Sequence, residues 1–281
     1  MQKYCIRAEQ IAAFVKALRD EDRSSGTIEK YSRDVRAFAA FLEAQCVTKE
    51  LATAWREHLL ACGYAPVTVN AMVAAINKFF SFLGWDTCRV KALRLQKKLF
   101  RDDCRELTRP EYERLVATAC TLQKERLALL MEAICATGIR VSELKYLTVE
   151  SASRGRAEIR LKGKIRIILL PGKLCRKLLK YARKQKIASG EIFLTRGGKG
   201  INRIQIWAEM KSLCKTAGVE PSKVFPHNLR HLFARTFYKI CRDVAKLADI
   251  LGHSSIDTTR MYLVSTGSEH MRELNRLHLI S

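Results

Sequence analysis

Four short motifs after residue 135 combine cationic, imidazole and hydroxyl side chains near predicted helix ends. In the first, Ala-Thr-Gly-Ile-Arg140-Val-Ser-Glu143-Leu, the glycine is expected to end one helix and Arg140 to open the next. An arginine at such a junction can present its planar guanidinium to a phosphate, with help from backbone N–H groups at the helix start. The same motif is equally consistent with a surface arginine that only pairs with Glu143.

The second motif, Pro-His227-Asn-Leu-Arg230-His231, follows a proline and so indicates the start of a helix. On a helix these three side chains would share one face, because they are three and four residues apart. Such a stripe is unusual for a core. It does not favour a metal site either, since Arg230 stands beside the imidazoles and no cysteine or carboxylate completes a ligand set at a familiar spacing.

The last two motifs supply one histidine and one tyrosine. In Leu-Gly-His253-Ser-Ser the glycine is expected to end a helix, with His253 at the turn that follows. In Thr-Thr-Arg-Met-Tyr262 the tyrosine comes nine residues after His253, and we expect it at the start of another short helix. Taken alone, each residue is more often structural, since a tyrosine usually packs or forms hydrogen bonds.

Together, two arginines, two histidines, one tyrosine and a lysine of a predicted β-hairpin describe a site for phosphoryl transfer. Such a reaction depends mainly on positioning and on stabilising the charge of the phosphate. The sequence contains no P-loop and no carboxylate cluster of the kind that holds Mg²⁺. We therefore expect side chains alone to meet the charge, with no metal and no cofactor.

The charge balance points to the same class of substrate. Lys and Arg outnumber Asp and Glu by 51 to 28, which gives a net charge of +23 over 281 residues, and most of the excess falls after residue 106. A polyanion such as DNA is the natural partner of such a chain. A basic surface with no partner is the alternative, but solubility alone needs a smaller imbalance.

Neither a membrane nor an oxidising compartment is indicated. The longest mostly apolar runs, such as 79–83 and 165–170, are too short to cross a bilayer, and residues 1–20 mix charges into an amphipathic pattern unlike a signal peptide. The 10 cysteines are scattered without a Cys-x-x-Cys pair, so we expect reduced thiols, mostly buried. We expect a soluble, cytoplasmic protein with no membrane partner.

Apolar residues at helical spacing predict a small all-helical bundle over residues 1–88. Thr27 and Thr68 stand where helix N-caps belong, and Gly63 and Gly84 stand where helices end. The first domain is therefore expected to contain helices only.

Residues 89–106 have poor periodicity and a high positive charge, which predicts a linker between two domains. A basic linker suits a segment that lies along a phosphate backbone, although a solvated connector fits the composition equally well. The linker ends at Thr108-Arg-Pro-Glu111, a capping box that opens a new helix.

The second predicted domain, residues 107–281, is mainly helical with one exception. Residues 158–161 and 165–170 alternate or run β-branched on either side of Lys162-Gly-Lys164, which predicts a β-hairpin with lysines at its tip. The expected fold class is therefore mainly α with one small β-sheet. Further helices are predicted over 174–184, 204–214, 227–240, 244–251 and 269–277.

In order and internal spacing, the motifs around Arg140, His227, Arg230, His253 and Tyr262 resemble those of the tyrosine recombinases, also called phage integrases. The resemblance covers nearly the whole chain. It implies a SAM-like, helical core-binding domain before an α-rich catalytic domain of the tyrosine recombinase fold, with DNA clamped between them. Because the chain starts directly at the core-binding domain, it looks closer in build to Xer recombinases and compact transposon integrases than to lambda-like integrases.

The resemblance also implies roles for single residues. Tyr262 is expected to be the nucleophile that attacks a backbone phosphate. Arg140 and Arg230 are expected to bind that phosphate, and His227 and His253 to donate hydrogen bonds to its oxygens. The expected products are a 3′-phosphotyrosyl link and a free 5′ hydroxyl. The 5′ hydroxyl of a second DNA strand can attack this link and so reverse the chemistry.

Glu143 matches the acidic position of the family that supports the first arginine. The family's catalytic lysine lies on the hairpin before a glycine, which points to Lys162 as the general acid toward the departing 5′ oxygen. Lys164 remains a rival, because the hairpin is about one residue tighter than the usual pattern. Further contacts to DNA are expected from Lys97, Lys98, Arg101, Lys164 and Arg166.

The implied activity is that of a site-specific DNA recombinase that integrates or excises a mobile element or inverts DNA. Xer-like resolution of chromosome or plasmid dimers is an alternative within the family, and a type IB topoisomerase is the closest other enzyme. A DNA-binding protein that has the fold without the activity is the alternative of another class.

The resemblance implies double-stranded DNA and further copies of the chain as partners. Members of the family act as homo-tetramers on DNA, with accessory DNA-bending proteins in some systems. The segment 269–277 places Met271, Leu274 and Leu277 on one face, which suits packing into a neighbouring subunit. Folding back onto its own domain explains the pattern equally well.

Overall fold

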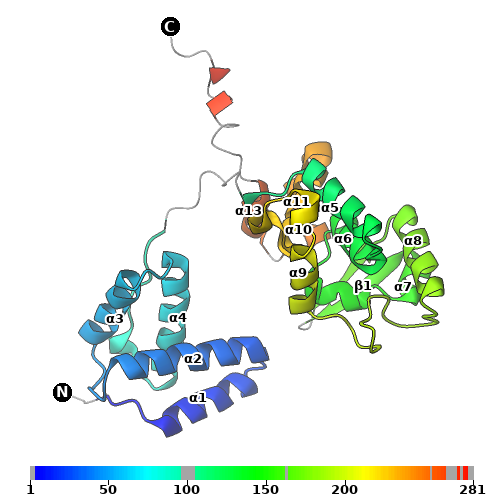
Figure 1. Ribbon diagram of the computed structural model, residues 1–281. Helices are drawn as coiled ribbons and strands as arrows, with labels where there is room; N and C mark the ends of the chain where they lie inside the picture. Colours follow the sequence, from blue (N-terminus) through cyan, green and yellow to red (C-terminus); the bar gives the residue numbers. More distant parts are fainter. Residues whose placement is uncertain are drawn as a thin grey trace. The chain divides into compact units, whose positions relative to one another are not determined.

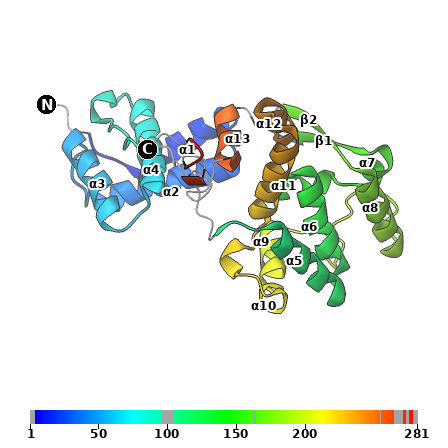
Figure 2. The ribbon, with the colours of Figure 1, turned by 90° about the horizontal axis from the view of Figure 1, so that it is seen from above.

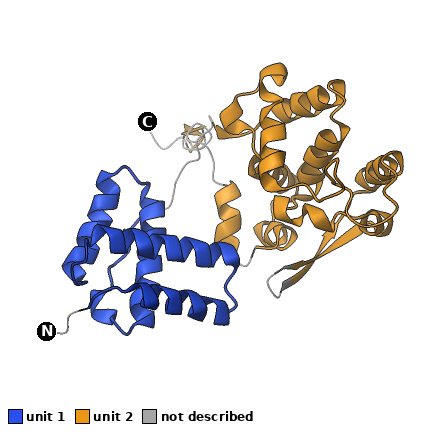
Figure 3. Cartoon of the chain, turned by 60° about the horizontal axis from the view of Figure 1, so that its bottom comes forward, with its two compact units in different colours: residues 1–97 blue, residues 98–281 orange. Residues whose placement is uncertain are grey.

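The computed structural model describes residues 4–95, 105–161, 164–253, 255–263, 271–272 and 275–277. It divides the chain into two compact units, residues 1–97 and 98–281 (Figure 3). The fold class predicted from the sequence, mainly α with one small β-sheet, is confirmed. No helix among the described residues is long and apolar enough to cross a membrane.

Unit 1 is a helical bundle around one apolar core (Figure 1). Gly63 and Gly84 follow the ends of its last two helices with positive φ angles of +79° and +72°, as predicted. The elements are α1 (Ala8–Asp20), α2 (Ser25–Phe41), α3 (Lys49–Ala61), α4 (Pro66–Phe82) and the 3-10 turn η1 (Asp86–Cys88). Every helix contributes to the core, with the large side chains Phe14, Leu18, Val35, Phe38, Trp55, Phe79 and Phe80.

Two of these helices begin earlier than the sequence predicted. The carbonyl of Ser24 accepts the N–H of Thr27 at 2.8 Å, so α2 has already begun at that threonine. Helix α4 has Pro66 in its first turn, where the fixed φ and the missing N–H of proline favour a helix start. Thr27 and Thr68 therefore lie inside helices, and their prediction as N-caps is wrong.

Residues 89–95, predicted as the first part of the linker, are bound to α4. Asn77 exchanges hydrogen bonds of 2.8 and 3.0 Å with the backbone of Val90, and Asn70 exchanges bonds of 2.9 and 2.7 Å with the backbone of Leu93. These residues therefore belong to unit 1, and the structure differs here from the predicted domain end at residue 88. The remaining linker residues of interest, Lys97, Lys98 and Arg101, lie outside the described residues.

Unit 2 is built around helix α6 (Glu125–Thr137). This helix packs against α5 (Arg109–Thr121), α8 (Gly172–Lys184) and α11 (Pro226–Cys241), and it lies between α8 and α11 (Figure 2). The predicted capping box opens α5, because the Thr108 N–H donates to Glu111 Oε2 at 2.8 Å and the Glu111 N–H donates to Thr108 Oγ1 at 3.4 Å. The other helical elements are η3 (Val141–Tyr146), α7 (Val149–Arg154), α9 (Arg203–Lys211), α10 (Cys214–Ala217), η4 (Pro221–Lys223), α12 (Val244–Leu251) and α13 (Ile256–Leu263).

The β-sheet is one antiparallel hairpin of β1 (Arg156–Leu161) and β2 (Lys164–Leu169), in which Leu161 pairs with Lys164. Side chains alternate along β2: Ile168 is buried, whereas Ile167 is 58% exposed. Arg166 lies two residues from Ile168 and shares its inner face. At the tip, Lys162 lies outside the described residues, and so does the side chain of Lys164.

The C-terminal segment is described only at 271–272 and 275–277, so most of the helix predicted over 269–277 lies outside the described residues. The expectation of mostly buried cysteines is wrong for the described part of the chain. Only Cys88, Cys175 and Cys214 are buried there, whereas others lie at exposed helix ends, such as Cys62 after α3 and Cys241 in α11.

Candidate active site

A glycine turn between α6 and η3 places Arg140. Gly138 ends α6 with a φ of +64°, and a Cβ at this position would lie 2.5 Å from the ring of Phe233 and 2.9 Å from Leu251. Both the backbone conformation and the close packing therefore require glycine. The chain then enters η3, where the Arg140 N–H donates to Glu143 Oε2 at 2.9 Å and Arg140 Nη1 donates to Oε1 at 3.0 Å.

Glu143 is a buried carboxylate, 1% exposed, that joins two arginines. Besides Arg140 it binds Nη2 of Arg166, whose Nη1 donates to the carbonyl of Ile250 at 3.2 Å. The Arg166 side chain is only 16% exposed, and a Cβ on Gly252 would touch its guanidinium. The guanidinium of Arg166 is thus bound to Glu143 and to the backbone of Ile250, and its contact with DNA stays a prediction.

Arg230 is the most deeply buried cation of the site, at 1% exposure. Its guanidinium donates to the carbonyl of Gly138 at the end of α6 and, at 2.7 Å, to the carbonyl of Leu251 at the end of α12. Carbonyls at helix C-termini carry partial negative charge and so stabilise a cation there. Burial, and next the nearby Arg140, lower the pKa of Arg230 to about 10, which leaves it charged at neutral pH.

Arg140 completes the cationic pair from the more open side. Its side chain is 37% exposed, and its Nη2 donates to the carbonyl of Gly252 at 3.2 Å. Two guanidiniums held by backbone carbonyls and one carboxylate form a rigid, positively charged surface. Such a surface matches the oxygens of a phosphate, for which planar guanidiniums are the best protein donors.

Both predicted histidines lie beside these arginines. His253 Nε2 is 3.0 Å from Arg230 Nη2, and His253 Nδ1 is 2.8 Å from the hydroxyl of Thr259. Burial, followed by Arg230 and Arg140, lowers the pKa of His253 to about 4. Partial burial, followed by His231 and Arg230, lowers the pKa of His227 to about 4, although this residue is exposed to solvent. Both rings are therefore neutral at pH 7.

Tyr262 lies in the last turn of α13, not at the start of a helix as the sequence predicted. The helix opens earlier, because the Ser255 carbonyl accepts the N–H of Thr258 at 3.2 Å. The tyrosine is 7% exposed, its hydroxyl is 3.4 Å from Nε2 of His227, and its ring stacks on His253 with centroids 5.3 Å apart. The hydroxyl thus lies beside His227 and Arg230.

The structure gathers six of the predicted site residues from four separate elements. It also brings in two residues that the sequence reasoning did not assign. His231 lies with its ring centroid 4.4 Å from that of Tyr262, and Thr259 binds His253. Thr259 lies one helical turn before Tyr262, so helical spacing could have pointed to it. The six gathered residues are Arg140, Glu143, His227, Arg230, His253 and Tyr262.

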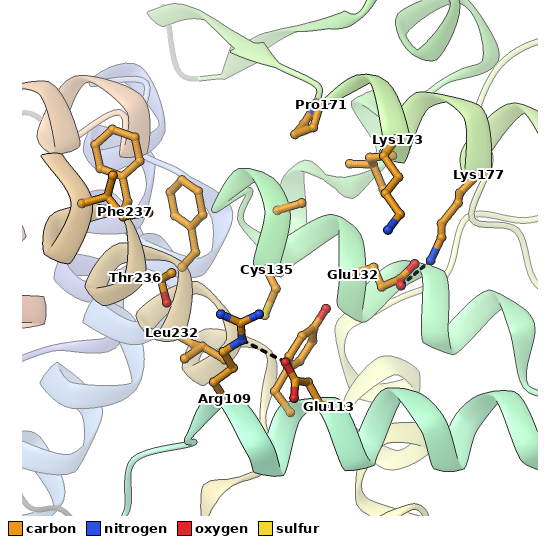
Figure 4. A pocket seen from close by; sticks show the side chains of 15 residues that line it. Arg109, Glu113, Glu132, Cys135, Pro171, Lys173, Lys177, Leu232, Thr236 and Phe237 are labelled. Atoms are coloured by element: carbon orange, nitrogen blue, oxygen red, sulfur yellow. Dashed lines mark hydrogen bonds and ion pairs between the residues drawn. The ribbon is translucent and has the colours of Figure 1, made fainter.

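Unit 2 also contains a cavity of about 540 Å³ that none of these residues lines. Figure 4 shows it between α5, α6, α8 and α11, with the pairs Arg109–Glu113 and Lys177–Glu132 on its walls, at 2.9 and 2.5 Å. Its lining is otherwise largely apolar, and Ile240 of α11 contributes to it while 79% exposed. Among the described residues, no group of three or more metal-ligating side chains is found.

Two protein-family models match the chain: the phage integrase family over residues 105–269 and the phage integrase N-terminal SAM-like domain over residues 11–86. The chain is 32% identical over 278 residues to tyrosine recombinase XerC of Roseiflexus castenholzii, covering 90% of this chain and 88% of that protein. It is 28% identical over 281 residues to tyrosine recombinase XerA of Pyrococcus furiosus, covering 97% and 95%.

Solved structures share the fold. The Tn1549 transposon integrase in complex with transposon right end DNA superposes with a TM-score of 0.71 at 18% identity, covering 95% of this chain and 99% of that one. A lambda integrase tetramer bound to a Holliday junction gives a TM-score of 0.74 at 17% identity, covering 93% and 78%.

Proposed function

The chain belongs to the phage integrase family and is a tyrosine-type site-specific DNA recombinase, and we propose that Tyr262 is its nucleophile. The observation that carries this proposal is the position of the Tyr262 hydroxyl, 3.4 Å from Nε2 of His227 and beside Arg230. Arg230 and Arg140 are held in turn by the carbonyls of Gly138 and Gly252, which lie 92 and 112 positions away in the chain. A nucleophile, a neutral imidazole and two fixed cations in one place are what phosphoryl transfer to a side chain requires.

In the proposed reaction, the Tyr262 oxygen attacks phosphorus and the bond to the 5′ oxygen of the DNA breaks. Negative charge grows on the two non-bridging oxygens, where Arg140 and Arg230 donate hydrogen bonds. His227 is neutral and lies within reach to accept the phenolic proton. Lys162 protonates the departing oxygen, with Lys164 as the alternative.

The intermediate is a 3′-phosphotyrosine, and attack by a 5′ hydroxyl reverses the steps. Each transfer makes one phosphoester bond and breaks one, so ATP is not consumed. We propose that the arginines, and not a metal ion, meet the charge of the phosphate. The enzyme is proposed to act on DNA in the cytoplasm.

The biological reaction we propose first is integration or excision of a mobile element, or inversion of DNA. Resolution of chromosome or plasmid dimers is the second candidate, favoured by relatives that are named Xer recombinases. The test is to incubate the protein with genomic fragments in the absence of metal and ATP, trap covalent adducts and sequence the attached DNA. Attachment at the ends of an element beside the gene supports integration, whereas one chromosomal site far from the gene supports dimer resolution.

We propose a homo-tetramer on double-stranded DNA, in which the segment 269–277 of one subunit packs into the cavity between α5, α6, α8 and α11 of its neighbour. The apolar face of that segment and the apolar lining of the cavity support this pairing. Ile240→Glu places a charge at the cavity and should remove tetramer-sized DNA complexes in analytical ultracentrifugation while leaving strand cleavage.

The matched control is Ile204→Glu, because Ile204 is 77% exposed on α9 and does not line the cavity. If both variants form tetramers on DNA as the wild type does, the cavity is not the docking site. Adding a DNA-bending protein to the same assay tests the expected accessory factor.

A further inference from the structure

The buried hydroxyl of Thr259 connects the helix of the nucleophile to the second histidine of the site. Thr259 is 0% exposed and lies on α13, one turn before Tyr262 and on the same side of the helix. Its Oγ1 is 2.8 Å from Nδ1 of His253. Packing alone would require the shape of this side chain but not its hydroxyl. The hydrogen bond to His253 gives the hydroxyl a separate role.

The partners of the imidazole determine where its proton is. Arg230 Nη2, 3.0 Å from Nε2 of His253, is a guanidinium nitrogen and can only donate. Nε2 must therefore accept. A neutral imidazole carries one N–H, so the proton is on Nδ1 and is donated to the Thr259 hydroxyl. Neutrality at pH 7 agrees with the lowered pKa of His253, which has its cause in burial and in the surrounding arginines.

A hydroxyl suits this position because it can also donate. When a phosphate oxygen takes the place of Arg230 opposite Nε2, the ring must carry its proton on Nε2 to donate to that oxygen. Nδ1 then becomes an acceptor, and the Thr259 hydroxyl can rotate to donate to it. The proton count of the imidazole is unchanged. An apolar side chain of the same shape could serve neither state.

We propose that Thr259 is a positioning residue that holds the ring of His253 in both proton arrangements and makes its orientation depend on the docking of α13. Because Tyr262 is on the same helix, the partner of His253 Nδ1 arrives together with the nucleophile. This inference rests on the proposed function only for its catalytic consequence. The bond between Thr259 and His253 can be tested without DNA.

Two substitutions separate the hydroxyl from the packing. Thr259→Val keeps the shape and removes the hydrogen bond, whereas Thr259→Ser keeps the hydroxyl and removes a methyl group. Thr258→Val is the matched control, since Thr258 is the preceding residue of the same helix and is exposed. Thermal unfolding followed by circular dichroism establishes that each variant is folded.

The first measurement is the pair of imidazole ¹⁵N chemical shifts of His253 in the full chain without DNA. The chain has six histidines, and the His253 signal is identified by its loss in His253→Gln. We expect an Nδ1–H ring in the wild type and in all three variants, because Arg230 still requires Nε2 to accept, and a shifted Nδ1–H signal in Thr259→Val alone, because only this variant loses the hydrogen bond. Unchanged shifts in Thr259→Val overturn the proposal, whether or not the protein cleaves DNA.

The second measurement is the single-turnover rate of covalent adduct formation on nicked DNA that traps the wild type. We expect Thr259→Val to be slower by about 10-fold or more, the order of loss seen when the hydrogen-bond partner of a metal-bound histidine is removed, and Thr259→Ser to stay within about 2-fold of the wild type. If instead the valine variant is active and the serine variant is slow, Thr259 acts through its packing. That result overturns the proposed role of its hydroxyl in catalysis. If the wild type forms no adduct, the proposed function fails while the chemical-shift result still decides the hydrogen bond.

Discussion

The carboxylate of Glu143 accepts a hydrogen bond of 3.0 Å from the guanidinium of Arg140, and this carboxylate is almost completely buried. The same carboxylate binds Arg166 from the other side. One negative charge thus orients the exposed arginine toward the place of the phosphate and neutralises a second arginine beneath it.

Glu143→Ala should lower both stability and cleavage, because it leaves two guanidiniums close together without their counter-charge. Loss of one partner from a buried ion pair costs 3–5 kcal/mol, and the partial exposure of Arg140 places the expected loss at the low end, about 3 kcal/mol. Urea unfolding of the full chain, followed by circular dichroism, measures it. A change below about 0.5 kcal/mol, typical of a surface substitution, would show that the pairs contribute little.

Gly138→Ala tests the turn that aligns Arg140. The added Cβ meets the ring of Phe233 at 2.5 Å in a backbone conformation with φ of +64°, so overpacking and strain add together. We expect a loss of about 2–4 kcal/mol in unfolding free energy. Gly155→Ala is the control, with a similar φ of +70° but nothing within 4 Å, and should lose about 1 kcal/mol. Equal losses in the two variants would mean that the contact with Phe233 has no role.

The lowered pKa of His253 predicts a pH dependence of stability. In the folded protein, burial and then the neighbouring Arg230 hold this pKa at about 4, whereas an unfolded histidine titrates near 6.5. Between these values the unfolded chain binds more protons, so stability that is fully present above about pH 6.5 is lost as the pH falls toward about 4. Urea unfolding from pH 7 to pH 4 should show a shallower decline for His253→Gln than for the wild type. If the unfolding free energies of the two proteins decline in parallel with pH, the loss of stability is caused by groups other than His253.

A leaving-group substitution can distinguish the two candidate lysines. If Lys162 protonates the departing 5′ oxygen, Lys162→Ala should slow cleavage by about 10²–10⁴-fold, which is the usual contribution of a general acid. DNA with sulfur in place of that oxygen should restore the rate, because a thiolate leaves without a proton. Lys164→Ala should be close to the wild type with both substrates. The opposite pattern assigns the acid to Lys164.

The sequence predicted much of this site because its motifs are local. Arg140 and Glu143 lie within one turn, and His227 and Arg230 lie on one helix face, so spacing along the chain is enough to relate them. It could not show which nitrogen of His253 faces Arg230, nor that the carbonyl of Gly138 holds that arginine. Those relationships arise from packing between α6, α11 and α12.

What the sequence did not show also has physical causes. Arg166 belongs to an apolar run, and only the register of β2 shows that it shares the inner face with Ile168 and therefore points toward Glu143. The sequence predicts Tyr262 at a helix start, but α13 begins after Ser255, more than one turn before the tyrosine. Thr68 resembles an N-cap by residue type, yet Pro66 starts the helix first.

The most direct test of the central proposal compares the wild type with Tyr262→Phe on nicked DNA fragments, without metal or ATP. The phenylalanine keeps the ring that stacks on His253 and loses only the hydroxyl. A protease-sensitive covalent DNA adduct that forms with the wild type and is absent with Tyr262→Phe, while both proteins bind DNA equally, is the predicted result. An adduct of equal yield with Tyr262→Phe would contradict the assignment of Tyr262 as the nucleophile.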